Sequence, residues 1–131
     1  MQPGMTLALW CVLFAAFIPF VFAGLAKSKG RFDNARPRAW LAALEGWRQR
    51  AHWAQLNSFE AFAPFAAGVI IAEMTAAAQA WVDGLAVAFV VLRLGYGFAY
   101  ISDRPGLRSI IWTAAFACTV GLFLAAAFSP A

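Results

Sequence analysis

Residues 50–65 read RAHWAQLNSFEAFAPF, and they open an apolar segment that continues to Ile71. At about 100° per residue, positions 50, 53, 57, 60 and 64 fall on one stripe of a helix. This stripe carries Arg50, Asn57 and Glu60, which a lipid-facing helix would not accept. A polar stripe at membrane depth is costly unless it faces protein or water, so the stretch indicates both a membrane helix and a functional site.

The composition of the chain places it in the membrane. Of its 131 residues, 63% are hydrophobic and 12% are charged, and the mean hydropathy is +0.72. Soluble domains have roughly 45–50% apolar and roughly 25% charged residues. The length fits a single domain, so we expect one integral membrane domain over residues 1–131.

The apolar runs predict four membrane-spanning helices, at about residues 5–26, 51–78, 81–101 and 109–128. The fold class is therefore an all-α, integral membrane four-helix bundle. A signal peptide is the competing interpretation of the first run, but that run exceeds the usual apolar core of about 7–15 residues. Its first charged side chain is Lys27. Glu73, near the end of the second span, is expected to reach the opposite membrane interface.

The basic residues are concentrated between the first two spans. Seven of the ten lie between Lys27 and Arg50, where the positive-inside rule explains them better than nucleic-acid binding does. The third connection is also basic, whereas the middle one carries only acidic charge. We therefore expect both basic connections in the cytoplasm and both termini on the periplasmic side of a bacterial inner membrane.

The residue types for metal or triad chemistry are sparse. Cys11 and Cys118 each lie in an apolar run, with no CxxC pair, and the chain has one histidine. These cysteines are expected to be membrane-embedded thiols, and a metal site is improbable. Since no Ser/His/Asp or Cys/His arrangement is present, a nucleophile would have to come from a bound cosubstrate.

A second polar set follows the first. Arg93, Tyr96 and Tyr100 recur at i, i+3 and i+7 and so share one face of the third span. Arg108 opens the fourth span, and the predicted topology brings it, with Arg93 and Arg50, towards the cytoplasmic side.

Two explanations of this convergence are open. In one, the polar groups pair internally, with Glu60 neutralising Arg93. This accounts poorly for three arginines against one glutamate. The excess of guanidinium groups favours an anionic ligand, because an unpaired charge at that depth is costly.

The two polar runs together resemble the MAPEG superfamily, the membrane-associated proteins in eicosanoid and glutathione metabolism. The runs are AQLNSFE at residues 54–60 and Arg93…Tyr96…Tyr100…Arg108-Ser109, and the resemblance covers essentially the whole chain. The loop DNARPR at residues 33–38 is more similar to bacterial members than to the animal leukotriene and prostaglandin synthases. The resemblance implies a homotrimer with a glutathione site between neighbouring subunits.

Roles for individual residues follow from this resemblance. Arg108, with Ser109 beside it, would donate to the glutathione sulfur and favour the reactive thiolate over the thiol. The thiolate would attack a lipophilic electrophile or peroxide from the bilayer. The glutathione-binding residues that the resemblance implies are Arg50, Gln55, Asn57, Glu60, Arg93, Tyr96 and Tyr100.

The sequence also departs from the family pattern. Enzymatic members usually carry an arginine four residues before the asparagine, where this chain has Trp53; Arg50 is the candidate to substitute for it. We therefore carry three hypotheses forward. The first is a membrane-bound glutathione-dependent transferase or peroxidase acting on lipophilic electrophiles. The second is a non-catalytic member that binds a lipid or small anion, and the third is an accessory subunit of a larger membrane complex.

Overall fold

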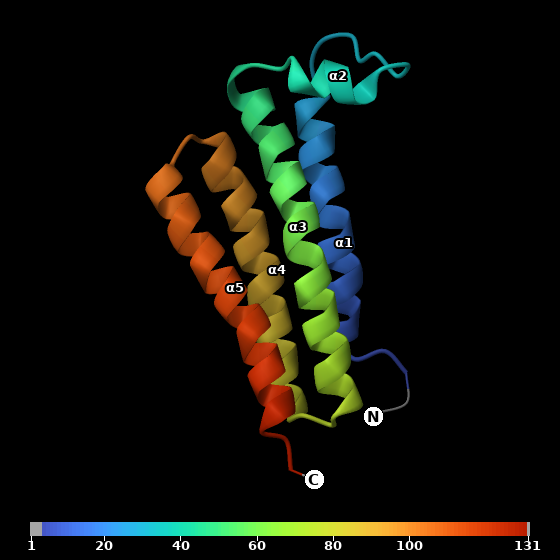
Figure 1. Cartoon of the computed structure of the whole chain (residues 1–131), viewed down its shortest axis with the longest axis vertical. Coiled ribbons are helices and arrows are strands. Elements are labelled where there is room, and N and C mark those ends of the chain that lie inside the picture. The colour runs from blue at the N-terminus through green and yellow to red at the C-terminus, as the bar shows by residue number, and fades with distance from the viewer. Residues whose placement is uncertain (1–3, 131) are drawn as a thin grey trace.

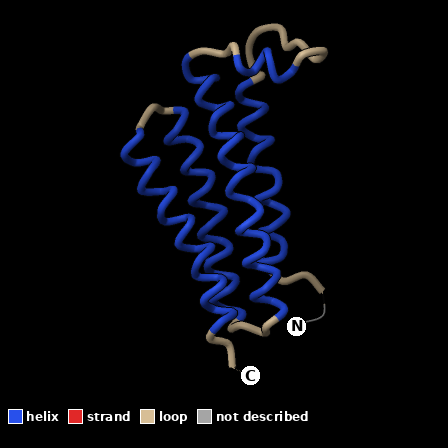
Figure 2. Tube along the Cα trace, in the orientation of Figure 1, coloured by secondary structure: helices blue, strands red, loops and turns tan. Residues whose placement is uncertain are grey.

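The chain folds into four long helices that run side by side, with a fifth, short helix across one end (Figure 1). The computed structural model describes residues 4–130. Within these residues there are helices and loops but no strand (Figure 2). The helices are α1 (Leu7–Ala26), α2 (Pro37–Ala42), α3 (Gly46–Met74), α4 (Gln79–Ile101) and α5 (Pro105–Ala127). The predicted all-α membrane bundle is confirmed.

Local sequence sets the helix boundaries. Thr6 caps α1 by accepting the Leu9 N–H at 3.2 Å, and α5 begins with Pro105 at its first position, where the missing N–H is no loss. α3 begins at Gly46 and ends at Met74, earlier at both ends than the predicted span of 51–78. It ends there because Ala76 adopts a left-handed backbone conformation, with φ of +54°.

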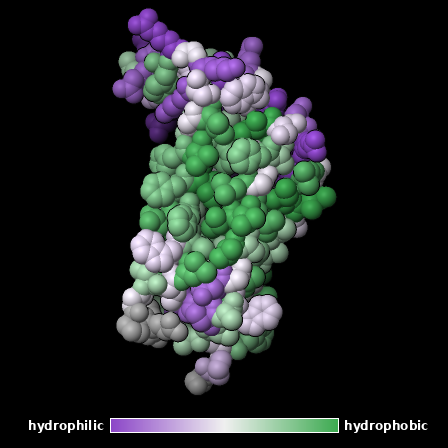
Figure 3. All heavy atoms as spheres, turned by 180° about the vertical axis from the view of Figure 1, so that it is seen from behind, coloured by the Kyte–Doolittle hydropathy of each residue, from purple (hydrophilic) through white to green (hydrophobic). Residues whose placement is uncertain are grey.

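Three of the four long helices, α1, α4 and α5, are long and apolar enough to cross a membrane. α3 is the longest helix and packs against all three, although its polar residues lower its mean hydropathy. On the face drawn in Figure 3, apolar side chains cover the middle of the bundle, while hydrophilic ones gather at the end that carries α2 and in a smaller patch near the other end. The polar helix is thus held among the apolar ones.

The interior is filled by aromatic and small side chains. The rings of Phe65 and Phe89 stack at 3.9 Å between α3 and α4. Gly97 of α4 lies directly against the buried ring of Phe22 of α1, so that a Cβ placed there would be 1.8 Å from the Phe22 Cζ. Cys11 and Cys118 are buried free thiols, as predicted.

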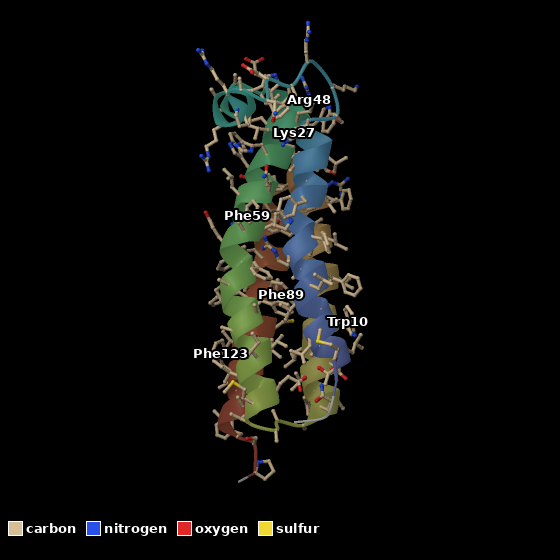
Figure 4. All side chains as sticks on the ribbon, turned by 90° about the vertical axis from the view of Figure 1, so that its right-hand side faces the viewer. Trp10, Lys27, Arg48, Phe59, Phe89 and Phe123 are labelled. Atoms are coloured by element: carbon tan, nitrogen blue, oxygen red, sulfur yellow. The ribbon has the colours of Figure 1, made fainter. Side chains whose placement is uncertain are left out.

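The two basic connections lie at the same end of the bundle, and the termini lie at the other end (Figure 1). Lys27 and Arg48 mark this basic end (Figure 4). An Arg48 side-chain N–H donates to the Lys29 carbonyl and ties the first connection to α3. The pairing of the connections agrees with the predicted topology, while the side of the membrane that each end faces stays a prediction.

A cluster of four polar side chains lies at the opposite end, and we call Thr6, Glu73, Gln79 and Asp83 the far-end cluster. Glu73 is 5% exposed and accepts from the Thr6 hydroxyl at 2.7 Å and the Gln79 amide at 2.8 Å. Gln79 also donates to Asp83, which accepts the Ala8 N–H as well. These donors hold the Glu73 carboxylate inside the protein at the far end of the bundle, and its position relative to the membrane interface stays a prediction.

Candidate functional site

Asn57 of α3 lies where three adjoining hollows meet near the basic end. The first, the Arg108 cleft, has a volume of about 320 Å³ and lies between α3, α4 and α5. The second, the Trp53 cleft, has about 390 Å³ between α3 and α4. The third, the inner cavity, has about 150 Å³ and lies further from the basic end. Asn57 lines all three.

Two arginines and two tyrosines form a continuous stack along α4 and the start of α5. The Arg93 guanidinium lies 4.1 Å from the Tyr96 ring centre, the two tyrosine rings meet edge to face at 5.8 Å, and the Arg108 guanidinium lies 4.4 Å from the Tyr100 ring centre. Cation–π contacts of this kind stabilise a guanidinium without neutralising it. Both positive charges therefore remain available to the hollows.

Arg93 is the most buried member of this stack, with 2% of its surface exposed. One of its terminal N–H groups donates to the Asn57 side-chain oxygen at 2.7 Å. Its Nε is a buried atom without a hydrogen-bond partner among residues 4–130. The internal pairing of Arg93 with Glu60 is thus replaced by a hydrogen bond to a neutral amide.

This bond fixes the orientation of the Asn57 amide. Because its oxygen faces Arg93, its NH₂ group is turned elsewhere, and its contact with the Glu60 carboxylate, at 3.5 Å, is long. The buried Arg93 thus holds the amide in place, while its NH₂ group makes only a long contact. That NH₂ group is suited to donate to an acceptor on a ligand. Glu60 is exposed and lines both the Trp53 cleft and the inner cavity.

The remaining predicted residues are divided between the clefts and their surroundings. Ser109 lines the Arg108 cleft beside Arg108. Arg50 is half-buried and donates its Nε–H to the Ile101 carbonyl at the end of α4, at 3.0 Å. Gln55 contacts His52 one turn away, at 3.2 Å. The stack, Asn57 and Glu60 are thus brought together, whereas Arg50 and Gln55 engage groups outside the three hollows.

Trp53 occupies the position where the resemblance in sequence led us to expect an arginine. Its side chain is 42% exposed and lies 6.2 Å from the Tyr100 ring, between ring centres. It forms a wall of the Trp53 cleft. This wall of the cleft is therefore formed by an indole and carries no charge.

α5 also contributes residues on the C-terminal side of Arg108 that were not predicted from the sequence. Trp112 lines both the Arg108 cleft and the inner cavity, and Ala115, Phe116 and Thr119 line the inner cavity. They follow Arg108 at i+4, i+7, i+8 and i+11, so one helical face carries them all. That periodicity, continued from Arg108, was the signal that could have identified them.

The model of the MAPEG family matches residues 7–128 of the chain. The chain belongs to the MAPEG family. No match was found among curated proteins, and none among solved structures. This MAPEG protein is therefore a membrane protein of the superfamily of eicosanoid and glutathione metabolism.

Proposed function

We propose that this MAPEG protein is a membrane-bound glutathione-dependent transferase or peroxidase that acts on lipophilic electrophiles. The observation that carries the proposal is the stack of Arg93, Tyr96, Tyr100 and Arg108 beside Asn57. It presents two guanidinium charges to the hollows: Arg93 donates one hydrogen bond to the Asn57 amide, each guanidinium contacts a tyrosine ring, and neither pairs with a carboxylate of residues 4–130. Glutathione has two carboxylates and a thiol that can ionise to thiolate, and guanidinium groups bind such anionic groups.

Binding and activation are assigned to different parts of the site. The weakly engaged NH₂ group of Asn57 is suited to a carbonyl or carboxylate of the tripeptide, and the exposed Glu60 to its α-amino group. Arg108 is half-buried and lines the Arg108 cleft. A guanidinium next to the sulfur stabilises thiolate, which is the reactive form.

The second substrate is proposed to enter from the bilayer. The walls of the inner cavity are mostly apolar, formed by Ala61, Pro64, Phe89, Trp112 and Phe116, and Phe89 lies at mid-height of the bundle (Figure 4). A lipophilic compound that partitions into the membrane can therefore approach the thiolate without crossing water. We propose that the basic end faces the cytoplasm, so that glutathione enters from there.

The functional unit is proposed to be a homotrimer. Large apolar side chains remain exposed along α1 and α5 of the single protomer, among them Phe14, Phe17, Ile110 and Phe116. Such surfaces suit either lipid or a neighbouring subunit. A neighbour packed beside α5 would close the Arg108 cleft and complete the glutathione site.

One observation favours a second function, a non-catalytic protein that binds a lipid or small anion. Trp53 removes a cation from the mouth of the site and makes that wall apolar. In this alternative the remaining arginines would hold an anionic headgroup rather than a thiol.

Isothermal titration of the detergent-solubilised protein with glutathione separates the two. The first function requires binding at millimolar ligand or below, followed by conjugation of a chromogenic aryl halide. Absence of heat at millimolar glutathione would eliminate it. Binding of glutathione without turnover, together with a co-purified lipid, would favour the second.

A further inference from the structure

We propose that the first connection of the bundle binds anionic phospholipids of the surrounding membrane, and that Lys27 and Arg48 contact the headgroup phosphate. This surface runs from Lys27 to Arg48 and includes α2, and we call it the basic cap. It lies apart from the proposed glutathione site, because residues 27–48 line none of the three hollows. The inference therefore goes beyond the proposed function and does not depend on it.

The first argument is the charge of the basic cap. Its only carboxylates are those of Asp33 and Glu45, and the Asp33 carboxylate accepts the Ala35 N–H within its own turn, at 3.0 Å. The cap carries six basic side chains, all exposed except the half-buried last one: Lys27, Lys29, Arg31, Arg36, Arg38 and Arg48. A cluster of about four to eight basic residues directly beyond a membrane helix attracts anionic headgroups.

The second argument is that two of these cations are held in place. The Lys27 ammonium lies 4.4 Å from the Phe32 ring centre, and the Phe32 and Trp40 rings meet edge to face at 5.1 Å. Gly30 approaches the same group, since a Cβ built on it would lie 3.8 Å from Trp40 Cζ2 and 3.5 Å from a terminal Arg48 nitrogen. Lys27 and Arg48 thus belong to one packed cluster.

This arrangement suits a phosphate. The Arg48 side chain also donates to the Lys29 carbonyl, and neither that carbonyl nor the Phe32 ring neutralises a positive charge. A guanidinium binds phosphate oxygens through a fixed fork, and an ammonium binds them as a point charge. Because contacts already restrict both side chains, they lose less conformational freedom when they bind one phosphate together.

The third argument is the depth of the basic cap in the membrane. Lys27 is the first residue after the apolar helix α1, which ends at Ala26. α2 lies across the end of the bundle (Figure 1), and its Leu41, 6% exposed, packs in one cluster with Ala26 of α1 and Ala51 of α3. The cap is therefore fixed where the membrane-spanning segment ends, and the anions concentrated at that depth are lipid phosphates.

The test measures lipid binding to the full chain in nonionic detergent by native mass spectrometry, with phosphatidylglycerol and phosphatidylcholine of identical acyl chains. We expect phosphatidylglycerol to bind the wild type at least about 10-fold more tightly, because the choline cation offsets the phosphate charge of the other lipid. The double variant Lys27→Gln/Arg48→Gln should bind phosphatidylglycerol about 30-fold more weakly, since two basic residues each contribute roughly 5-fold. Equal affinity of the wild type for the two lipids would overturn the inference.

Arg36→Gln/Arg38→Gln is the matched control, because it removes the same charge from two other exposed positions of the basic cap. We expect it to weaken phosphatidylglycerol binding less than about 5-fold, since these side chains add only an attraction that salt screens. Equal weakening in the two double variants would make the cap a diffuse basic surface and overturn the assignment of Lys27 and Arg48.

Two single variants cover the case in which Lys27→Gln/Arg48→Gln does not fold. Lys27→Gln changes an exposed position and should weaken phosphatidylglycerol binding about 5-fold. Phe32→Leu keeps the charge and removes the ring beside the Lys27 ammonium, and it should weaken binding about 2- to 5-fold. Melting curves identify the folded variants, and unchanged lipid binding in either folded variant would overturn the inference.

Other sources of phosphate are separated by competition. Inorganic phosphate and single-stranded RNA, each at the same phosphate concentration and ionic strength, should leave phosphatidylglycerol bound to the wild type. Displacement of the lipid by inorganic phosphate would assign the cap to a soluble anion, and displacement by RNA would assign it to nucleic acid. Either result would overturn the inference.

Glutathione titrations keep this inference separate from the proposed function. The glutathione Kd should be the same in the wild type and in Lys27→Gln/Arg48→Gln. A raised glutathione Kd with unchanged lipid binding would assign both side chains to the glutathione site and overturn the inference. If the wild type bound phosphatidylglycerol but no glutathione, only the proposed function would fall.

Discussion

Both ends of the bundle hold polar side chains inside an apolar protein, but the hydrogen bonding of these side chains differs between the two ends. In the far-end cluster, the Glu73 and Asp83 carboxylates receive donors from α1 and α4, each within 3.0 Å. Near the basic end, the Arg93 Nε–H has no partner within residues 4–130, and in that part of the chain the Asn57 NH₂ group makes only the 3.5 Å contact to Glu60. Groups satisfied internally stabilise the fold, whereas groups left with capacity beside a hollow are available to a ligand.

The largest effect we expect is on the thiol. Arg108→Met should reduce kcat/KM for conjugation by about 10²–10³-fold, because it removes the charge that stabilises thiolate, while the glutathione Kd changes less. Steady-state kinetics with a chromogenic aryl halide measure the first and isothermal titration the second. Arg104→Met serves as the control, because Arg104 is exposed outside the three hollows, and equal rates in wild type and Arg108→Met would clear Arg108 of any role in activation.

The second prediction compares alanine substitutions at the two glutamates of α3. Glu73→Ala should lower thermal stability, because Thr6 and Gln79 lose their acceptor at a cost of about 1–3 kcal/mol for each buried group left unpaired, and should leave the glutathione Kd unchanged. Glu60→Ala, at an exposed position, should do the reverse. Melting curves in detergent and titrations of both variants check this; if both lost stability alike, the distinction between the two ends would not hold.

The third prediction concerns the packing behind the cleft. Gly97→Ala should destabilise the bundle by about 1–3 kcal/mol or more, because the new Cβ would overlap the fully buried Phe22 ring. Gly84→Ala, where nothing lies within 4 Å, is the matched control and should be neutral or slightly stabilising, since alanine favours a helix. If Gly97→Ala left the stability unchanged, the packing between α1 and α4 near the basic end would be loose. The unpaired donors of Arg93 and Asn57 would then reflect poor packing instead of a ligand site.

The smallest effect is expected at the mouth of the site. Trp53→Arg should tighten glutathione binding about 2- to 5-fold, which is what a partly exposed ion pair of up to about 1 kcal/mol provides. The gain should shrink at high salt because such a pair is screened. Titrations at low and high ionic strength measure it. Weaker binding in Trp53→Arg would show that the indole itself contacts the ligand.

The sequence predicted the fold well because membrane burial imposes simple rules on residue order. Long uncharged runs must become helices where no water can satisfy the backbone, and the basic connections must share one end when the spans alternate. Arg93, Tyr96 and Tyr100 were predicted to share a face from spacing alone, and they do. The α5 face carrying Trp112 and Thr119 was missed because apolar spacing of this kind is typical of ordinary packing.

Taken by itself, the sequence determined the membrane class, the helical architecture and the family resemblance, since hydropathy, charge placement and motif spacing are properties of residue order. Only the tertiary structure decided which polar groups find partners. It enclosed Glu73 in the far-end cluster, directed Arg50 to the Ile101 carbonyl and left the Arg93 Nε–H without a partner in the described part of the chain. Such pairing depends on distances across helices far apart in the chain, and no local pattern encodes those distances.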